Sequence, residues 1–282
     1  MAARTKLVYQ QHGELRQLLS KVISISPVST LPAADQVLVK DASEEDYALV
    51  TDETIFYVQG GGQPSDTGSI SSTSLSISTS SEGPTTFEVN SVRHPSTGGA
   101  ILHFGRFKNP LTNNATPTFS PGQEIRQDID AEKRDFYSRL HTAGHILGLA
   151  INALVRDGVL PNTLRESKAS HYPDSAAVEF GGLIEGKFKE AIQARTDEFV
   201  HRASEVRIHW WPMERLLKEC TGVTEGFELP EGETLGRVVE MVGLGAYPCG
   251  GTHVGDCGAV GRIEVRKISR SKGVSRVSYR VL

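Results

Sequence analysis

The sequence predicts an α+β protein built in two parts, a β-rich half followed by a half that mixes helices and strands. Up to about Ile129, short segments with the composition of β-strands alternate with Pro, Gly, Asp and Asn, a pattern typical of strands joined by turns. From Asp130 onward, apolar residues recur every three or four positions, which is the spacing of an amphipathic helix. We therefore expect a β-domain at residues 1–129 and an α+β domain at residues 130–282.

The expected strands of the first half are short and separated by turn residues. They are Lys6–Tyr9, Gln36–Val39, Tyr47–Val50, Thr54–Val58 and Gly99–Phe104. Between the last two lies a serine-rich tract at residues 69–81, in which Leu75 and Ile77 alternate with polar residues. This tract fits either an exposed hairpin edge, which we favour, or a flexible insertion.

The second half begins with a long helix, expected from Asp130 to about Asp157. Its apolar stripe consists of Phe136, Leu140, Ala143, Leu147, Ala150 and Leu154. Gly158 and Pro161 then end the helix. A second amphipathic helix is expected at residues 185–205, and the expected strands are Ser175–Phe180, Val206–Trp210, Gly236–Glu240 and Gly261–Ile268. These elements predict a sheet covered by helices.

The composition limits the classes of function. With 282 residues, 38% of them hydrophobic, the chain is long enough to bury one large core or two smaller ones. A formal net charge of −4 means that any nucleic-acid contact must come from a local basic patch. Three cysteines without a scaffold spacing indicate a reducing compartment, and no feature indicates a membrane or an obligate protein partner. We expect a cytoplasmic protein; the mildly basic first 22 residues leave organellar targeting as an alternative.

Two pairs of metal-binding side chains have ligand spacing. His141 and His145 are four residues apart on the long helix, so both imidazoles lie on one face. About a hundred residues later, Cys249 and His253 are also four apart, in a turn where Gly250 and Gly251 let the backbone curl. Each pair alone is a weak indication, since paired histidines are more often an ordinary polar pair. Together they make a tetrahedral set of three nitrogens and one sulfur that suits Zn²⁺.

Other metal chemistry is disfavoured. Thr142 follows His141 where a zinc protease of the HExxH type needs a glutamate as general base, so that motif is not met. Cys220 and Cys257 have no histidine at ligand spacing, and we expect them to be ordinary small residues.

At this point three segments resemble one known family. Residues 134–147 and 248–254 are similar to the HxxxH and CxxxH motifs of alanyl-tRNA synthetase editing domains and of their free-standing relatives, the AlaX proteins. Residues 56–68 resemble the glycine-rich motif that precedes the HxxxH helix in that family, and residues 272–276 resemble the segment that closes the editing domain. The resemblance covers nearly the whole chain in the family's order.

The resemblance implies an architecture and an activity. The architecture is an N-terminal β-barrel domain of translation-factor type followed by an α+β editing core. The activity is zinc-dependent hydrolysis, in trans, of tRNA(Ala) that carries serine, glycine or both. It implies zinc ligation by His141, His145, Cys249 and His253, either by all four or by three with a water. Cys249, Gln63 and Thr252 become candidate catalytic residues, the last two for orienting the attacking water.

The same resemblance suggests residues that contact the aminoacylated tRNA. Gly60, Gly61 and Gly62 could present backbone N–H groups to an oxyanion, with Thr67 as a further pocket residue; without the resemblance, a β-hairpin turn is the better interpretation of the glycines. For phosphate contact we expect Arg134, Arg139, Lys267, Arg270, Lys272 and Arg276, because the C-terminal segment is locally basic. A solvated charged face is the ordinary alternative.

Three rival functions remain. A full synthetase needs an adenylation domain for which the two expected domains leave no room. A non-catalytic, zinc-stabilised RNA-binding module would unfold without zinc, whereas an editing enzyme would lose turnover and keep its fold. A hydrolase of small esters or amides would act without tRNA.

Overall fold

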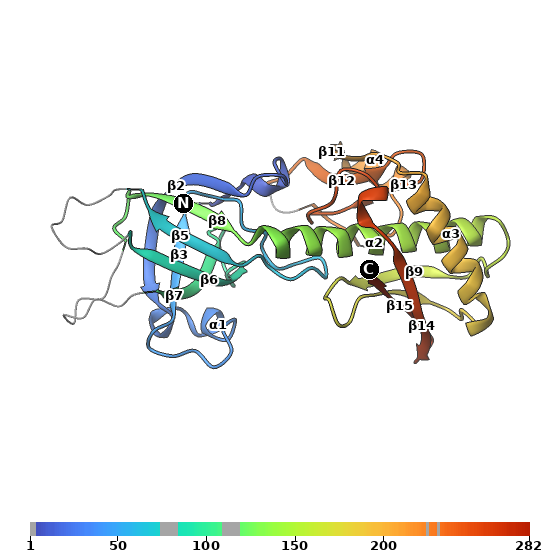
Figure 1. Cartoon of the computed structure of the whole chain (residues 1–282), viewed down its shortest axis with the longest axis horizontal. Coiled ribbons are helices and arrows are strands. Elements are labelled where there is room, and N and C mark those ends of the chain that lie inside the picture. Colours follow the sequence, from blue (N-terminus) through green and yellow to red (C-terminus); the bar gives the residue numbers. More distant parts are fainter. Residues whose placement is uncertain (1–3, 74–83, 109–118, 224–225, 230–231) are drawn as a thin grey trace. The chain divides into compact units, whose positions relative to one another are not determined.

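The computed structural model describes residues 4–73, 84–108, 119–223, 226–229 and 232–282. The chain forms two compact units, each described by itself below (Figure 1). The first contains Met1–Gln59 and Pro64–Arg134, and the second contains Gly60–Gln63 and Asp135–Leu282. The glycine turn at residues 60–63 therefore belongs to the unit that carries the HxxxH helix.

Six strands of the first unit close into a barrel in the order β2-β3-β7-β6-β5-β8, with antiparallel pairing throughout. In β6, the buried side chains of Phe87 and Val89 alternate with exposed Glu88 and Asn90, which is the period of a strand with one face in a core. The expected β-barrel is confirmed. The strands are β2 (Gln17–Pro27), β3 (Tyr47–Thr51), β5 (Gly68–Ser72), β6 (Thr86–Arg93), β7 (Leu102–Phe107) and β8 (Glu124–Ile129).

Outside the barrel, some of the expected strands are wrong or shorter. Residues 36–39 are not a strand: helix α1 (Ala33–Gln36) follows Pro32, and the N–H groups of Leu38 and Val39 continue with turn-type bonds to carbonyls three residues back. The first strand is only β1 (Lys6–Leu7), paired with β4 (Glu53–Thr54) and followed by a short 3-10 helix. Most of the serine-rich tract, residues 74–81, lies outside the described residues.

The strand expected at residues 54–58 ends early because side chains take over its backbone donors. The N–H of Phe56 donates to Thr54 Oγ1 at 3.1 Å, and the N–H of Tyr57 donates to Asp66 Oδ2 at 2.7 Å. Bonds of this kind replace a strand ladder with a fixed loop.

The second unit packs helices and two sheets around one core. The core joins Leu147 of α2, Ile192 of α3, Phe180 of β10 and Val265 of β14, all with at most 1% of their surface exposed. One sheet has the order β14-β15-β10-β9 and the other the order β11-β12-β13. The elements are α2 (Ala131–Arg156, divided between the units after Arg134), β9 (Arg165–Ser170), β10 (Ala177–Gly181), α3 (Lys189–His201), β11 (Val206–Pro212), α4 (Met213–Glu219), β12 (Leu235–Met241), β13 (Gly245–Pro248), β14 (Ile263–Ser271) and β15 (Val274–Val281).

Helix α2 is buried more completely than its apolar stripe predicted. Every residue from Leu140 to Ile151 is buried, so this stretch is enclosed on all sides. His141 and His145 therefore lie in the interior, where polar atoms need partners. Among the described residues, no helix combines the length and the apolar composition needed to cross a membrane.

Candidate metal centre

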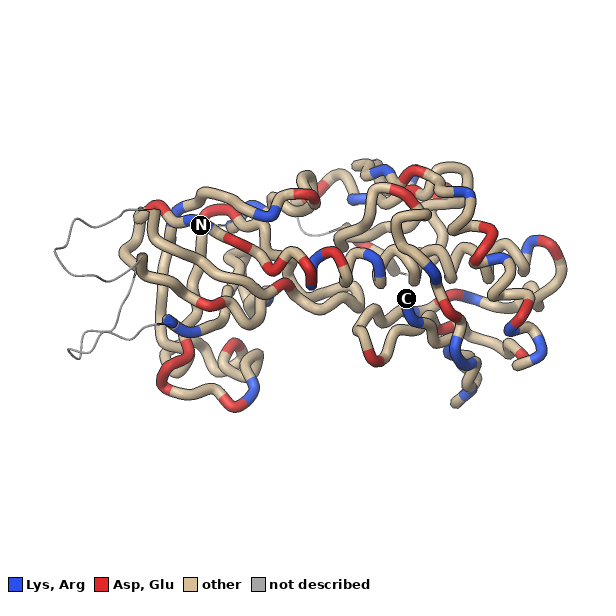
Figure 2. The backbone as a smooth tube through the Cα atoms, in the orientation of Figure 1, with Lys and Arg blue, Asp and Glu red and all other residues tan. Residues whose placement is uncertain are grey.

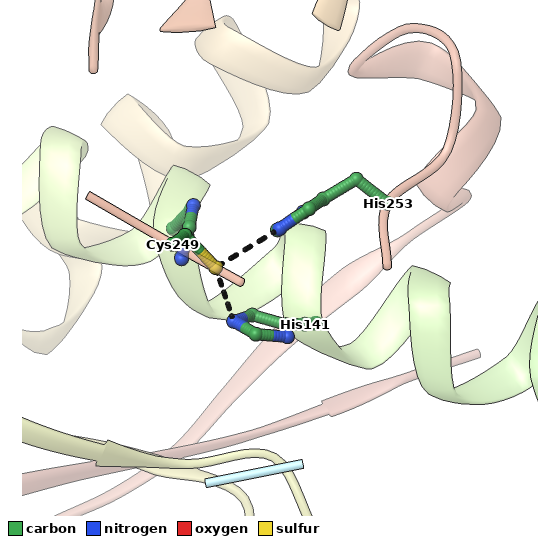
Figure 3. A group of neighbouring side chains, drawn as sticks. His141, Cys249 and His253 are labelled. Atoms are coloured by element: carbon green, nitrogen blue, oxygen red, sulfur yellow. Dashed lines mark hydrogen bonds between the residues drawn. The ribbon is translucent and has the colours of Figure 1, made fainter. Parts of the chain in front are cut away.

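The two predicted pairs of ligands meet at one point of the second unit. His141 and His145 come from α2, and Cys249 and His253 come from the turn after β13; one ligand atom from each lies within 4.8 Å of the other three. The Sγ of Cys249 is 3.4 Å from Nε2 of His141 and 3.4 Å from Nε2 of His253. Figure 3 shows the rings of His141, on α2, and of His253, in the turn after β13, pointing at the Cys249 sulfur.

These distances fit a tetrahedral cation. Typical Zn–N and Zn–S bonds at a tetrahedral angle place a nitrogen and a sulfur about 3.6 Å apart. The observed 3.4 Å separations are close to this value. In addition, Nδ1 of His145 is buried and has no hydrogen-bond partner among the described residues. The group could therefore hold a metal ion, and its donor set of three imidazoles and a thiol is of the kind that zinc takes.

A second layer of hydrogen bonds orients the imidazoles. Oε1 of Gln63 accepts a bond from Nδ1 of His141 at 2.6 Å, which puts the ring proton on Nδ1 and leaves the lone pair of Nε2 facing Cys249. Nδ1 of His253 lies 3.1 Å from Oγ1 of Thr142, which places its Nε2 toward the same sulfur. His141 and His253 thus present Nε2 to the centre.

The predicted catalytic pair Gln63 and Thr252 forms this second layer. Gln63 Nε2 donates to Thr252 Oγ1 at 2.9 Å, and the N–H of Thr252 donates to Gln63 Oε1 at 3.2 Å. Ser138 Oγ adds a bond to the same hydroxyl at 2.8 Å. Gln63 and Thr252 have at most 2% of their surface exposed. Their polar atoms are bonded to each other and, through Gln63, to the ligand His141.

Two glycines allow the close approach of these turns. A Cβ at Gly251 would lie 2.2 Å from Cε1 of His141, so only glycine lets the Cys249 turn pass the ring. Gly61 and Gly62 have φ values of 51° and 78°, and Gly60 and Gln63 pair across them, which is a tight turn with positive φ at both central positions. A Cβ at Gly62 would lie 2.4 Å from the carbonyl oxygen of Ala169. The turn therefore lies directly against the end of β9.

Burial keeps the imidazoles neutral. The pKa values of His141, His145 and His253 are held well below their usual value, mainly by desolvation and further by Arg237 and by the neighbouring imidazoles. Burial also raises the pKa of the Cys249 thiol, while Arg237 and the N–H of Gly251 lower it. Neutral imidazoles are the form that ligates a metal, and a coordinated thiol is deprotonated, so metal binding is expected to release a proton.

The structure adds residues that the sequence did not single out. The ring of His171 stacks on that of His141 with centroids 4.1 Å apart, and its Nδ1 bonds to the hydroxyl of Tyr279 at 2.7 Å. Burial lowers the pKa of His171 to about 3. On another side, the Tyr247 ring lies 4.5 Å from that of His145, and its hydroxyl donates to Glu166 at 2.9 Å. No local spacing marks these residues, because they come from three different strands, β9 and its end, β13 and β15.

Two of the predicted tRNA-binding residues lie in the barrel unit. The hydroxyl of Thr67 accepts a bond from Lys133 Nζ at 3.0 Å. Arg134 has no exposed surface: it forms an ion pair with the equally buried Asp66 and also donates to the carbonyl oxygens of Gly13 and Ile55. This placement argues against a phosphate contact by Arg134, since its guanidinium is used inside the unit.

Arg139 lies on α2 and donates to the carbonyl oxygens of Val260 and Leu282. The other predicted phosphate contacts, Lys267, Arg270, Lys272 and Arg276, lie on the β14–β15 hairpin, where Figure 2 shows Lys and Arg down to the tip. Arg270 and Lys272 are exposed and form no ion pair with another described residue. Arg276 donates to Glu179 at 2.9 Å and to the carbonyl of Ser175 at 2.6 Å, so its charge is partly neutralised. Lys267, along β14, is also exposed and forms no ion pair with another described residue, so the free cationic groups among these predicted residues lie along β14 and at the hairpin tip.

Comparison with known proteins gives similarity to one kind of enzyme. The chain is 29% identical over 244 residues to an alanine–tRNA ligase of Halorubrum lacusprofundi, a match that covers 84% of this chain and 23% of the relative. It is 29% identical over 251 residues to an alanine–tRNA ligase of Thermotoga petrophila (88% of this chain, 26% of the relative) and 28% identical over 236 residues to one of Methanothermobacter thermautotrophicus (82% and 23%). The chain thus spans about a quarter of the length of these relatives. No protein-family model matches the chain.

Proposed function

We propose that this chain is a zinc-dependent aminoacyl-tRNA deacylase that hydrolyses tRNA(Ala) charged with the wrong amino acid. One observation carries the proposal. The convergence of His141, His145, Cys249 and His253 lies within a chain similar over most of its length to part of alanine–tRNA ligases. The donor set supports a catalytic metal, and the similarity supports tRNA(Ala) as the substrate.

The chemistry of alanine selection gives such an activity a purpose. A pocket that admits alanine cannot exclude the smaller glycine by size. It also rejects serine poorly, because small differences in an apolar pocket are worth only about 1–3 kcal/mol. A second, hydrolytic site then removes what the first site admits. We propose serine and glycine esters as substrates, and we propose that the chain acts in trans in the cytoplasm.

Within this proposal, the chain's residues divide into ligands and supports. Cys249 and His253 are partly exposed, whereas His141 and His145 are buried. The aminoacyl ester therefore approaches from the side of the Cys249 turn. Zinc, when bound, supplies Lewis-acid polarisation of the ester or an anchor for the amino group. Gln63 and Thr252 hold the ligand shell in place, so we assign them to positioning rather than to contact with the attacking water.

Removal of one ligand tests the proposal. We expect His145→Ala to lose zinc and to reduce deacylation of Ser-tRNA(Ala) by more than about 100-fold, because loss of even an outer partner of a metal ligand costs about 10- to 100-fold. His201→Ala is the matched control, since His201 is an exposed histidine of α3 in the same unit. A His145→Ala protein that lacks zinc and deacylates at the wild-type rate would contradict the proposal.

The rival RNA-binding module makes a different prediction for metal removal. The ligands adjoin an apolar core that joins α2, α3 and both sheets. Because this core is independent of the metal, we expect a chelator to abolish deacylation while the far-ultraviolet circular dichroism changes little. Unfolding on chelation would favour the zinc-stabilised module instead.

A further inference from the structure

Two consecutive tryptophans on β11 face opposite sides of the three-stranded sheet. Trp211 is 5% exposed and packs in the core beneath α4, with the Arg215 guanidinium 4.0 Å from its ring centroid. Trp210 is 39% exposed. Successive side chains of a strand alternate between faces, so Trp210 lies on the face opposite to α4.

Trp210 begins a row of cross-strand neighbours that ends at the metal centre. It is paired with Arg237 of β12. The N–H of Cys249 donates to the carbonyl of Arg237 at 3.1 Å, which extends the β12–β13 register by one residue beyond the pair Val238 and Pro248. Directly opposed residues of antiparallel strands share a face. Trp210, Arg237 and Cys249 therefore lie side by side on one face (β11, β12 and β13 in Figure 1).

The row has the chemistry and the length of a nucleotide site. Two strand spacings separate Trp210 from Cys249 by roughly 10 Å. The Arg237 guanidinium lies between them and donates to the carbonyl of Cys249 at 2.5 Å. In an aminoacyl ester of a nucleoside, a ribose separates the ester carbon from the base by a comparable length. An ester at the metal would thus place its base at the indole.

We propose that Trp210 is the stacking platform for the terminal adenine of the aminoacylated tRNA. The inference rests on the proposed function and names the contact that holds the nucleotide next to the reacting ester. Base stacking on an aromatic ring is strong enough to set the affinity for a short single strand and tolerates any base, with purines preferred by their larger ring. Arg237 is only 9% exposed and donates to the carbonyl of Cys249, so its part is to hold the Cys249 turn beside Trp210.

A binding experiment without turnover tests the contact. The trinucleotides CpCpA and CpCpU are titrated into the whole chain and followed by isothermal titration calorimetry, which reads binding without using Trp210 as the reporter. We expect CpCpA to bind more tightly than CpCpU. Trp210→Ala should weaken CpCpA binding by about 10- to 100-fold and remove the preference, whereas Trp210→Phe should retain most of the affinity. Leu217→Ala is the control, since Leu217 is 55% exposed on α4.

Turnover of Ser-tRNA(Ala) separates this contact from the proposed function. Stacking that is equal in the ground state and the transition state predicts a higher KM and an unchanged kcat for Trp210→Ala. Wild-type binding of CpCpA that is weakened in Trp210→Ala, in a protein without deacylase activity, would support the nucleotide site and refute the function. Wild-type binding too weak to measure, or equal CpCpA affinity in wild type and Trp210→Ala, would refute the stacking role whether or not the protein deacylates. Trp210→Phe guards against a folding defect, because it keeps an aromatic ring.

Discussion

Replacement of Gln63 by methionine should weaken metal binding although Gln63 is not a ligand. The change keeps the length and volume of the side chain and removes its amide. Three hydrogen bonds then disappear, those with Nδ1 of His141 and with the N–H and Oγ1 of Thr252. The hydroxyl of Thr252 keeps its bond to Ser138, but the two N–H donors are left buried without an acceptor.

The magnitude follows from these two donors. Each unsatisfied buried donor costs about 1–3 kcal/mol, so we expect Gln63→Met to lower the free energy of unfolding by about 2–6 kcal/mol. Without the acceptor at Nδ1, the proton of His141 is also free to move to Nε2, the nitrogen that faces Cys249. The zinc affinity should therefore fall by about 10- to 100-fold.

Two measurements check this prediction. Competition with a chromophoric chelator gives the zinc affinity, and urea unfolding of the metal-free protein gives the stability. Gln63→Glu is the control because a carboxylate still accepts from His141 and Thr252, and it should bind zinc within about 10-fold of wild type. A Gln63→Met protein with wild-type zinc affinity would refute the view that Gln63 fixes the ring of His141.

Three further predictions concern the barrel and the hairpin. Arg134→Leu should destabilise the protein by about 3–5 kcal/mol in thermal or urea unfolding, because Asp66 is left buried without its partner; a loss below 1 kcal/mol would contradict this. Burial lowers the pKa of His103 from 6.5 to about 4, so the folded barrel holds it neutral. Between these two pH values the unfolded chain binds a proton at His103 and the folded chain does not. The free energy of unfolding should therefore keep its full value above pH 6.5 and fall by about 3 kcal/mol as the pH drops toward 4. Hydrogen exchange of β3 and β7 should report that loss, and His103→Gln should abolish it. At the hairpin tip, Arg270→Gln and Lys272→Asn should each reduce the slope of log affinity for tRNA against log salt by about 1, as removal of one phosphate contact requires; unchanged slopes would place the tRNA elsewhere. Asparagine is chosen because Lys272 has φ of 48°.

Elements with a strong local pattern could be predicted from the sequence. The helix expected at residues 130–157 is α2 at Ala131–Arg156, and the strand expected at Val206–Trp210 is β11 at Val206–Pro212. The helix shows as apolar residues that recur every three or four positions, and the strand as a short run with the composition of a β-strand. By contrast, Thr54–Val58 has the composition of a strand but ends early, because Asp66 and Thr54 capture its backbone donors. Such capture depends on residues brought together by folding.

The candidate site divides in the same way. The four candidate ligands have a spacing of four within each pair, which a helix or a glycine turn converts into a shared direction. The sequence alone could not place Gln63 behind His141 or His171 against it, since these contacts join distant segments. Arg134 shows the opposite case. Its charge suggested a phosphate contact, but its burial against Asp66 was decided by tertiary packing.

Deacylation of Ser-, Gly- and Ala-charged tRNA(Ala), measured side by side, shows whether this chain removes the wrong amino acid from tRNA(Ala). We expect the metal-loaded wild-type protein to hydrolyse the serine ester, the glycine ester or both faster than the alanine ester, and Cys249→Ala to hydrolyse none of them above the spontaneous rate. Equal hydrolysis by wild type and Cys249→Ala, or no hydrolysis of any of the three by the metal-loaded wild type, would contradict it.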